Sequence, residues 1–186
     1  PHDLAEAYST FWHEQQSDPK SYFEDVRRSF NAHGGSARLL YLLTRCVKNA
    51  VRFNAVGEFN QSADHRRLGT RPERMTQNIL GAHKLLVGRC TVSHADFSSQ
   101  LQQATPRDLI YLDPPYQGTS GARDRRYYQL LDRDRFVTEL DQLRKRSIPF
   151  IVSYDGRCGD RNYGDGLPSE LGLKHIELNA GRSSQS

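Results

Sequence analysis

The clearest capacity for chemistry lies in four consecutive residues, Asp113-Pro114-Pro115-Tyr116. Each proline fixes its own φ, disfavours the helical region for the residue before it, and lacks an N–H. The tetrapeptide is therefore predicted to form a stiff, extended corner at which the Asp113 carboxylate and the Pro114 carbonyl face the same way. Two acceptors placed together suit the two N–H donors of an amino group bonded to an aromatic ring. Tyr116 adds a ring on which such a group can stack.

An amino group of this kind, such as that of adenine, is a weak nucleophile because its lone pair is delocalised into the ring. Hydrogen bonds to Asp113 and Pro114 would favour a more tetrahedral nitrogen and turn the lone pair toward an incoming methyl group. A sulfonium cofactor would supply that methyl group, and the protein would orient the reactants. The same four residues are also common in simple turns. Their position straight after an apolar segment favours the catalytic interpretation.

The elements that position this corner alternate between strand and helix. Extended segments are predicted at Cys90–Ser93, Asp108–Leu112, Pro149–Tyr154 and Leu173–Leu178, and an amphipathic helix at Arg133–Arg146. Apolar strands joined by helices predict an α/β fold with a parallel sheet that helices cover on both faces. Ligands bind at the carboxyl ends of the strands in such sheets. Asp113 is therefore expected at the active edge.

The first 88 residues lack this alternation. Apolar residues recur at helical spacing up to Asn49, and Asp18-Pro19 is typical of a helix start. Residues Val51–Arg71 lose the periodicity, which predicts an exposed loop or hairpin of the kind that often carries recognition. A further helix is expected from Pro72 to Gly88. We therefore predict a helical and loop region at residues 1–88 and a second region at residues 89–186.

Taken together, these motifs resemble the DNA adenine N6-methyltransferases of the Dam-like class, which carry an Asp-Pro-Pro-Tyr motif with a target-recognition insert ahead of it. Thr44–Asn49, Arg52–Asn54 and Gly57–Asn60 resemble the recognition signature of that class. The resemblance implies a Rossmann-like methyltransferase sheet flanked by helices, with residues 1–88 as the target-recognition region and residues 89–186 as the C-terminal part of the catalytic domain. It also implies S-adenosylmethionine as cofactor and double-stranded DNA as partner. Separately, the start of the sequence lacks a charged-then-apolar signal segment, which predicts a cytoplasmic protein. A cognate restriction endonuclease system is a further candidate partner.

The resemblance extends to the cofactor site. His94-Ala95-Asp96-Phe97 is similar to a motif of the class in which an acid and an aromatic residue flank the adenine ring of the cofactor. By resemblance, Asp96, Phe97 and Asp113 are cofactor-side residues. The residue types alone favour a helix N-cap for Asp96 and a core aromatic for Phe97. The glycine-rich cofactor loop of the class does not occur in this sequence, and we expect it to lie upstream of Pro1.

Two arginine-rich segments are candidates for contact with DNA. Arginine binds phosphate, paired hydrogen bonds from Arg and Asn read guanine and adenine edges, and tyrosine stacks on bases. Both segments could instead be solvated loops. The candidate DNA-binding residues are Arg52, Asn54, Asn60, Arg66, Arg67, Arg123, Arg125, Arg126, Tyr127 and Tyr128.

Composition sets outer bounds on function. The net charge of +4 suits a polyanionic partner without requiring one. No run approaches the ~20 consecutive apolar residues of a membrane span, and neither the three cysteines nor the histidines have the spacing of a metal site. Two alternatives stay open: an amino-group methyltransferase acting on RNA or protein, and a non-catalytic DNA-specificity subunit that has lost cofactor binding.

Overall fold

The computed structural model describes residues 1–49, 51–115, 131–154, 157–158, 161–162 and 165–178. The chain divides into two compact units, Pro1–Val92 and Ser93–Ser186, which are treated separately below. The functional division predicted at residues 88 and 89 remains a prediction.

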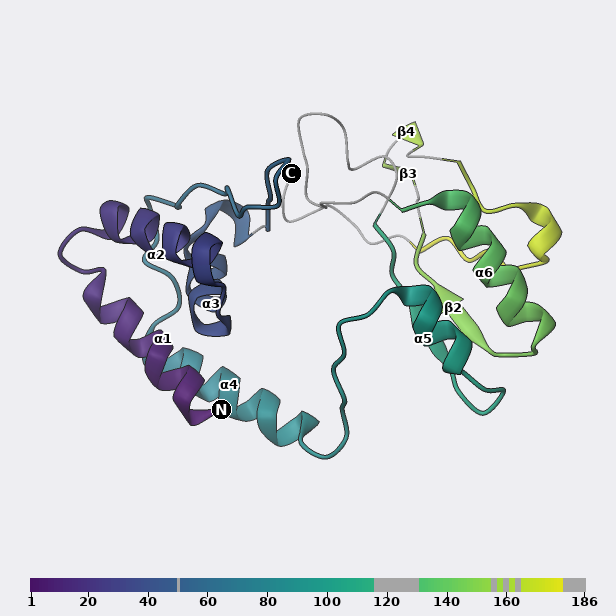
Figure 1. The fold of residues 1–186 in the computed structure, drawn as a ribbon, viewed down its shortest axis with the longest axis horizontal. Coiled ribbons are helices and arrows are strands. Elements are labelled where there is room, and N and C mark those ends of the chain that lie inside the picture. The colour runs from purple at the N-terminus through teal and green to yellow at the C-terminus, as the bar shows by residue number, and fades with distance from the viewer. Residues whose placement is uncertain (50, 116–130, 155–156, 159–160, 163–164, 179–186) are drawn as a thin grey trace. The chain divides into compact units, whose positions relative to one another are not determined.

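The first unit is a layer of four α-helices. They are α1 (His2–Glu14), α2 (Pro19–His33), α3 (Ser36–Arg45) and α4 (Pro72–Leu86), with a short 3-10 turn, η1 (Val47–Asn49), after α3 (Figure 1). The start of α2 agrees with the sequence pattern: Pro19 is its first residue, and the Asp18 carboxylate accepts a 3.1 Å hydrogen bond from the Ser21 N–H. This bond satisfies one of the N–H groups that have no partner within the helix.

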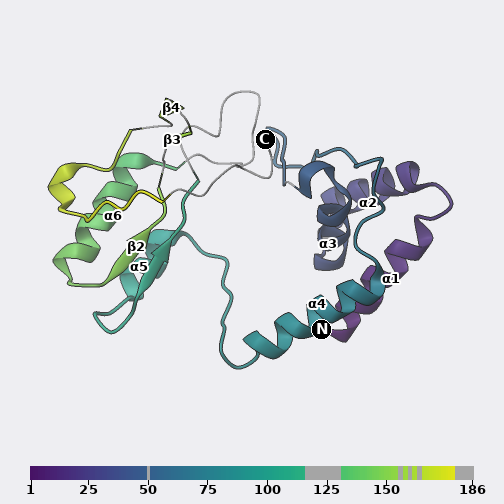
Figure 2. The same ribbon diagram turned by 180° about the vertical axis from the view of Figure 1, so that it is seen from behind.

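Aromatic side chains fill the core of the first unit. The Tyr41 ring lies at its centre, with ring centroids 5.7 Å from Phe11, 5.8 Å from Tyr22 and 6.4 Å from Phe23. Helix α1 packs against both α3 and α4, and Figure 2 shows α1 and α4 side by side. The buried apolar residues of this core are Tyr8, Phe23, Val26, Tyr41, Leu42, Cys46, Phe59, Ala63 and Met75.

The segment between α3 and α4 begins as a hairpin. Phe53 pairs with Phe59 in an antiparallel bridge, the Asn54 N–H donates to the Glu58 carbonyl at 2.9 Å, and the Asn60 N–H donates to the Arg52 carbonyl at 3.0 Å. The hairpin prediction is therefore confirmed. The expectation of an exposed segment was wrong in part, because the Phe59 side chain is buried and packs edge-on against Phe30 and Phe53.

The second unit combines helices with short strands. Its elements are α5 (Phe97–Gln103), β1 (Ile110–Leu112), α6 (Arg133–Lys145), β2 (Phe150–Val152), β3 (Arg157–Cys158), β4 (Arg161–Asn162) and the 3-10 turn η3 (Ser169–Leu171). β1 and β2 are parallel, with Tyr111 opposite Ile151, whereas β3 and β4 form a separate antiparallel pair. The strand-helix-strand order β1-α6-β2 is the arrangement that the sequence predicts.

The β1–β2 sheet is packed on one face. Ile110, Leu112 and Phe150 lie against a core to which α5 contributes Leu101 and α6 contributes Leu143. The outer face, which carries Leu109, Tyr111 and Ile151, is exposed, with exposed fractions of 68%, 62% and 55%. The predicted cover on both faces is therefore not formed by the described part of the chain.

Two predicted strands are not formed. Cys90–Ser93 and Leu173–Leu178 have no regular secondary structure, and Val92 is 90% exposed. Extended residues become a strand only when a neighbour pairs with their backbone, and neither segment pairs with another described strand. The α/β class is thus supported by mixed helices and a two-stranded parallel sheet, which is compatible with a methyltransferase fold. None of the described helices is both long enough and apolar enough to cross a bilayer.

Candidate functional site

The Asp113 corner lies at the carboxyl edge of the parallel sheet. β1 ends at Leu112, and Asp113 follows it directly with an exposed side chain. The Leu112 carbonyl accepts a 2.9 Å hydrogen bond from the Ser153 N–H, which lies just past the end of β2. Pro114 and Pro115 are half-buried. The corner is therefore held at the edge where the two parallel strands end, as the sequence predicts.

Three aromatic rings in contact with one another pack beside the end of β2. Tyr154, two residues past β2, stacks on Phe136 of α6 with ring centroids 5.9 Å apart and an interplanar angle of 11°. Phe136 meets Phe97 of α5 edge-on at 6.0 Å. Because offset and edge-to-face ring contacts are favourable beyond the area they bury, these rings connect the end of β2, the first turn of α6 and the start of α5.

Asp96 and Phe97 lie at the beginning of α5. The Asp96 carboxylate accepts a 3.0 Å hydrogen bond from the Ser98 N–H and forms an ion pair with Arg135 of α6. The Arg135 guanidinium also donates to Ser98 Oγ at 2.7 Å and lies over the Phe97 ring, 5.0 Å from its centroid. The hydrogen bond from Arg135 is the main cause that lowers the pKa of Asp96, which therefore stays charged. Asp96 is thus the N-cap that its residue type favours, and its contact with a cofactor stays a prediction.

Arg135 is a residue that sequence reasoning missed. It lies in a helix whose apolar positions explain the pattern, so nothing in the local sequence marks it. Its contacts with Asp96 and Phe97 join residues 38 and 39 positions apart in the sequence. Only the packing of α6 beside α5 brings them together.

Arg66 and Arg67 are held by a single buried acid. Asp64 Oδ1 accepts from the Arg66 N–H at 2.9 Å, and Asp64 Oδ2 accepts from Arg67 Nε at 3.0 Å. The Asp64 side chain is 6% exposed, whereas those of Arg66 and Arg67 are 83% and 65% exposed. Arg66 and Arg67 are thus both held by Asp64, which we call their anchor. Their guanidinium groups are exposed to solvent. Asp64 was missed in the sequence because a lone acid in a basic segment carries no distinct signal.

Asp64 predicts a pH dependence of this arrangement. The hydrogen bond from the Arg66 N–H, followed by those from the Arg66 and Arg67 side chains, lowers the pKa of Asp64. A carboxyl whose pKa is lowered on folding stabilises the fold above its ordinary pKa of about 3.9, and that contribution is lost as the pH falls through the lowered value. We expect the Arg66 amide signal in NMR to shift only below about pH 3.9. The Asp64→Asn variant should lack this transition, and a midpoint above the ordinary pKa would contradict the assignment.

The hairpin gives different surroundings to the other predicted DNA contacts. Asn54 Oδ1 accepts from the Val56 and Glu58 N–H groups, and Asn54 Nδ2 donates to Glu58 Oε2 at 2.8 Å. The Asn54 amide therefore shapes the turn. Arg52 is half-buried and Asn60 is exposed, and the hairpin places them opposite each other. Base contacts by these residues stay predictions.

Six predicted site residues lie outside the described part of the chain. They are Tyr116, Arg123, Arg125, Arg126, Tyr127 and Tyr128. Their proposed roles in stacking and in contact with DNA are likewise predictions.

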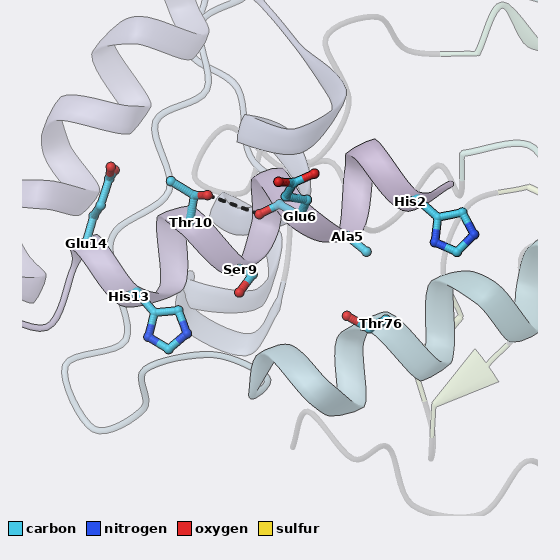
Figure 3. Close-up of a pocket in the computed structure, with 8 residues that line it drawn as sticks. All are labelled: His2, Ala5, Glu6, Ser9, Thr10, His13, Glu14 and Thr76. Atoms are coloured by element: carbon cyan, nitrogen blue, oxygen red, sulfur yellow. Dashed lines mark hydrogen bonds between the residues drawn. The ribbon is translucent and has the colours of Figure 1, made fainter.

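Two hollows of the first unit are lined by described residues other than Asp64. One of them, of about 650 Å³, is an open groove along α1, where Figure 3 shows Thr76 of α4 facing the α1 side chains. It is lined by His2, Ala5, Glu6, Ser9, Thr10, His13, Glu14 and Thr76. A second hollow of about 560 Å³ borders the segment after Arg67, with Trp12, Leu68, Gly69, Arg71, Pro72 and Glu73 around it. Within the described residues, no three His, Cys, Asp or Glu side chains gather as metal ligands would.

Comparison with known proteins found a matching family and a related phage protein. The family of D12 class N6 adenine-specific DNA methyltransferases matches residues 1–182. Among individual proteins, the DNA N-6-adenine-methyltransferase of Escherichia phage P1 is 24% identical over 142 residues, which cover 74% of this chain. The matched region is 17% of the length of that phage protein, so the chain corresponds to a minor part of it. With a family match that spans both units, the chain belongs to the D12 class N6 adenine-specific DNA methyltransferase family.

Proposed function

We propose that this chain carries the catalytic corner and the target-recognition region of a site-specific DNA adenine N6-methyltransferase. The observation that carries the proposal is the position of Asp113 and Pro114 at the carboxyl edge of the parallel β1–β2 pair. This edge is where open α/β sheets bind their ligands. Membership of the family supports the same activity and implies S-adenosylmethionine as methyl donor.

Asp113 and Pro114 would act on the adenine amino group. The Asp113 carboxylate and the Pro114 carbonyl would each accept a hydrogen bond from one of the two N6–H groups, which favours a more tetrahedral nitrogen and turns its lone pair toward the incoming methyl group. The carboxylate would also stabilise the positive charge that develops on N6 as the N–C bond forms and the S–C bond of the sulfonium breaks, in a site that is already oriented. One N6 proton is then lost to solvent, which leaves neutral N6-methyladenine. The adenine must leave the duplex to reach this corner, and Tyr116 is our candidate for the ring on which it stacks.

Asp96 and Phe97 have the residue types that would bind the adenine end of the cofactor. Asp96 offers a charged, half-exposed acceptor whose pKa is lowered, and Phe97 offers a partly buried ring beside it. S-adenosylmethionine, when bound, supplies an electrophilic methyl group on its sulfonium. Arg135 orients both residues, because it pairs with Asp96 and covers part of the Phe97 ring.

Residues 1–88 would recognise the DNA. Arg66 and Arg67 present adjacent exposed guanidinium groups from a fixed anchor, which suits contact with neighbouring phosphates. Arg52 and Asn60 lie opposite each other on the hairpin and are our candidates for base contacts. Double-stranded DNA is thus the proposed partner, and the Rossmann-like sheet extended by further strands is the proposed setting of β1 and β2.

Methyl transfer to competing substrates tests the proposal. The full-length gene product is incubated with tritiated S-adenosylmethionine and, in parallel, with duplex DNA, RNA and protein. We expect label in N6-methyladenine from the DNA alone. Label in RNA or protein would establish a different substrate for the same corner, and no label in any substrate would establish a non-catalytic subunit.

The exposed arginines predict the salt dependence of DNA binding. Arg67→Ala is expected to weaken binding to all duplexes alike and to reduce the slope of log affinity against log salt by about 1, because one phosphate contact is lost. Fluorescence anisotropy with labelled duplexes across a salt series measures both effects. Arg28→Ala is a matched control, because Arg28 is a 78% exposed arginine paired with an acid three residues before it. Loss of discrimination at one base pair would instead assign Arg67 to base reading, and unchanged binding would exclude it from the interface.

A further inference from the structure

One guanidinium group is fully buried in the first unit. Arg45, the last residue of α3, is 1% exposed, and its side chain reaches three other segments. Nε donates to Gln15 Oε1 at 2.6 Å, NH1 donates to the Asp64 carbonyl at 2.9 Å and to the Arg67 carbonyl, and NH2 donates to the Pro19 carbonyl at 3.4 Å. All of these acceptors are neutral oxygens. Two of them belong to the segment that carries Arg66 and Arg67.

The burial of this charge requires an explanation. Removing a guanidinium from water is costly unless its N–H groups find good partners. Here much of its donor capacity goes to the backbone of residues 64–67 rather than to packing helices together. The planar fork of arginine can reach several acceptors that the single ammonium of lysine cannot.

Other buried polar groups bind the same segment from the helix side. Gln15 Nε2 donates to the Leu68 carbonyl at 2.9 Å, and the Tyr8 hydroxyl donates to the Thr70 carbonyl at 2.6 Å. Gly69, with φ of +85°, passes so close that a Cβ would lie 3.0 Å from Thr44 Oγ1. The carbonyls of residues 64, 67, 68 and 70 are therefore all held by side chains of α1, of α3 and of Gln15, which directly follows α1. The guanidinium groups of Arg66 and Arg67 face solvent.

We propose that Arg45 is a positioning residue for DNA recognition, which fixes the backbone of residues 64–70 so that Arg66 and Arg67 meet adjacent phosphates in a set geometry. This role rests on the proposed function. A segment that is ordered before it binds loses less conformational entropy on binding, and that saving appears as affinity. Arg45 itself touches no DNA, because its side chain is buried.

Arg45→Lys tests the role through local order and through coupling. Hydrogen exchange should become at least about tenfold faster at residues 64–70, with the central amides of α1 and α2 unchanged. Affinity for a short labelled duplex should fall about tenfold, equivalent to 1.4 kcal/mol. In the Arg66→Ala/Arg67→Ala background, Arg45→Lys should cause no further loss, because the groups it positions are gone.

Two further variants keep the test decisive. Arg27→Lys is the matched control, because Arg27 is a 28% exposed arginine that donates to a single nearby carbonyl, that of Gln61, at 3.4 Å. Its exchange and affinity should stay at wild-type values. Tyr8→Phe removes only the hydroxyl that binds Thr70, so it should speed hydrogen exchange at residues 69–71 and weaken duplex binding less than Arg45→Lys does. If Arg45→Lys fails to fold, Tyr8→Phe still tests whether a fixed backbone at this segment contributes to binding.

Three outcomes overturn the proposal. Faster exchange across all helices would show that Arg45 acts on global stability. An equal loss of affinity in the Arg66→Ala/Arg67→Ala background would show that it acts elsewhere. If the Arg66→Ala/Arg67→Ala variant binds DNA with wild-type affinity, these two residues do not contribute to DNA recognition, and Arg45 cannot act through them. Methyl transfer by the wild type, measured beside these assays, shows whether the proposed function stands in each case.

Discussion

Replacing Asp113 with alanine is expected to lower kcat for methyl transfer to DNA adenine by about 10²–10³-fold, the range seen when one preorganised charge-stabilising contact is removed. The reason is that the Pro114 carbonyl would be left as the sole acceptor for the two N6 hydrogens at the carboxyl edge of β1. Affinity for the duplex should change little, because phosphate contacts supply most of it. Single-turnover transfer of tritiated methyl by the full-length gene product, together with duplex binding, separates these effects.

A matched control keeps this result specific. Asp134→Asn changes an acid in the same unit whose side chain is 99% exposed, and it should transfer methyl at the wild-type rate. Asp113→Asn retains an acceptor oxygen but removes the charge, so we expect a rate between those of the wild type and Asp113→Ala. Full activity of Asp113→Ala would refute the proposed mechanism, whatever substrate the enzyme uses.

Phe136→Ala is expected to destabilise the second unit by about 3–5 kcal/mol, the usual cost of removing a buried phenylalanine ring. Phe136 is 1% exposed, stacks on Tyr154 and meets Phe97 edge-on. Its loss leaves a cavity next to Tyr154, which follows β2, and next to Phe97, which follows Asp96. Methyl transfer should therefore fall together with stability.

Hydrogen exchange at β1 and β2 measures this effect where it occurs. Protection of these strand amides in Phe136→Ala should fall by about 10²-fold or more, the equilibrium equivalent of the lost stability. Gln142→Ala, an exposed position on the same helix, should retain full protection. The chain has one tryptophan, Trp12, so its fluorescence follows the first unit independently. Unchanged strand protection in Phe136→Ala would mean that the ring contacts contribute little to the site.

The parts of the fold that sequence predicts are those that local chemistry determines. The start of α2 follows from Asp18 and Pro19, whose cap and fixed φ act within one turn. The inward residues of α6, Phe136, Leu140 and Leu143, follow from their helical spacing. The β1–β2 pairing follows from two apolar segments separated by a helix. For α2 and α6, the signal and the structure lie within a few residues of each other.

The parts that sequence cannot predict depend on distant partners. Cys90–Ser93 has strand character, but pairing depends on a neighbour that the segment itself does not specify. An apolar run such as Leu109–Leu112 likewise does not reveal that one of its faces is exposed. The strand patterns therefore predict which segments tend to be extended, but they do not predict which of these segments pair in a sheet.

The candidate site shows the same division. Asp113, Pro114 and Pro115 could be proposed as candidates from the sequence, because adjacent residues of these types determine their own local geometry. The support of the backbone at residues 64–68 could not, because it depends on Arg45 and Gln15, which are far away in sequence and come together only when the chain folds. Asn54 was chosen for its amide, yet that amide serves the hairpin turn.

The open face of the β1–β2 sheet has a thermodynamic consequence. Leu109, Tyr111 and Ile151 are already hydrated in the folded chain, so unfolding exposes less new apolar surface than it would in a fully covered sheet. The heat-capacity increment of unfolding of the second unit should thus fall below the usual ~12–15 cal/mol/K per residue. The stability of this unit then varies less steeply with temperature, and any surface that covers the face would make the stability curve more sharply domed.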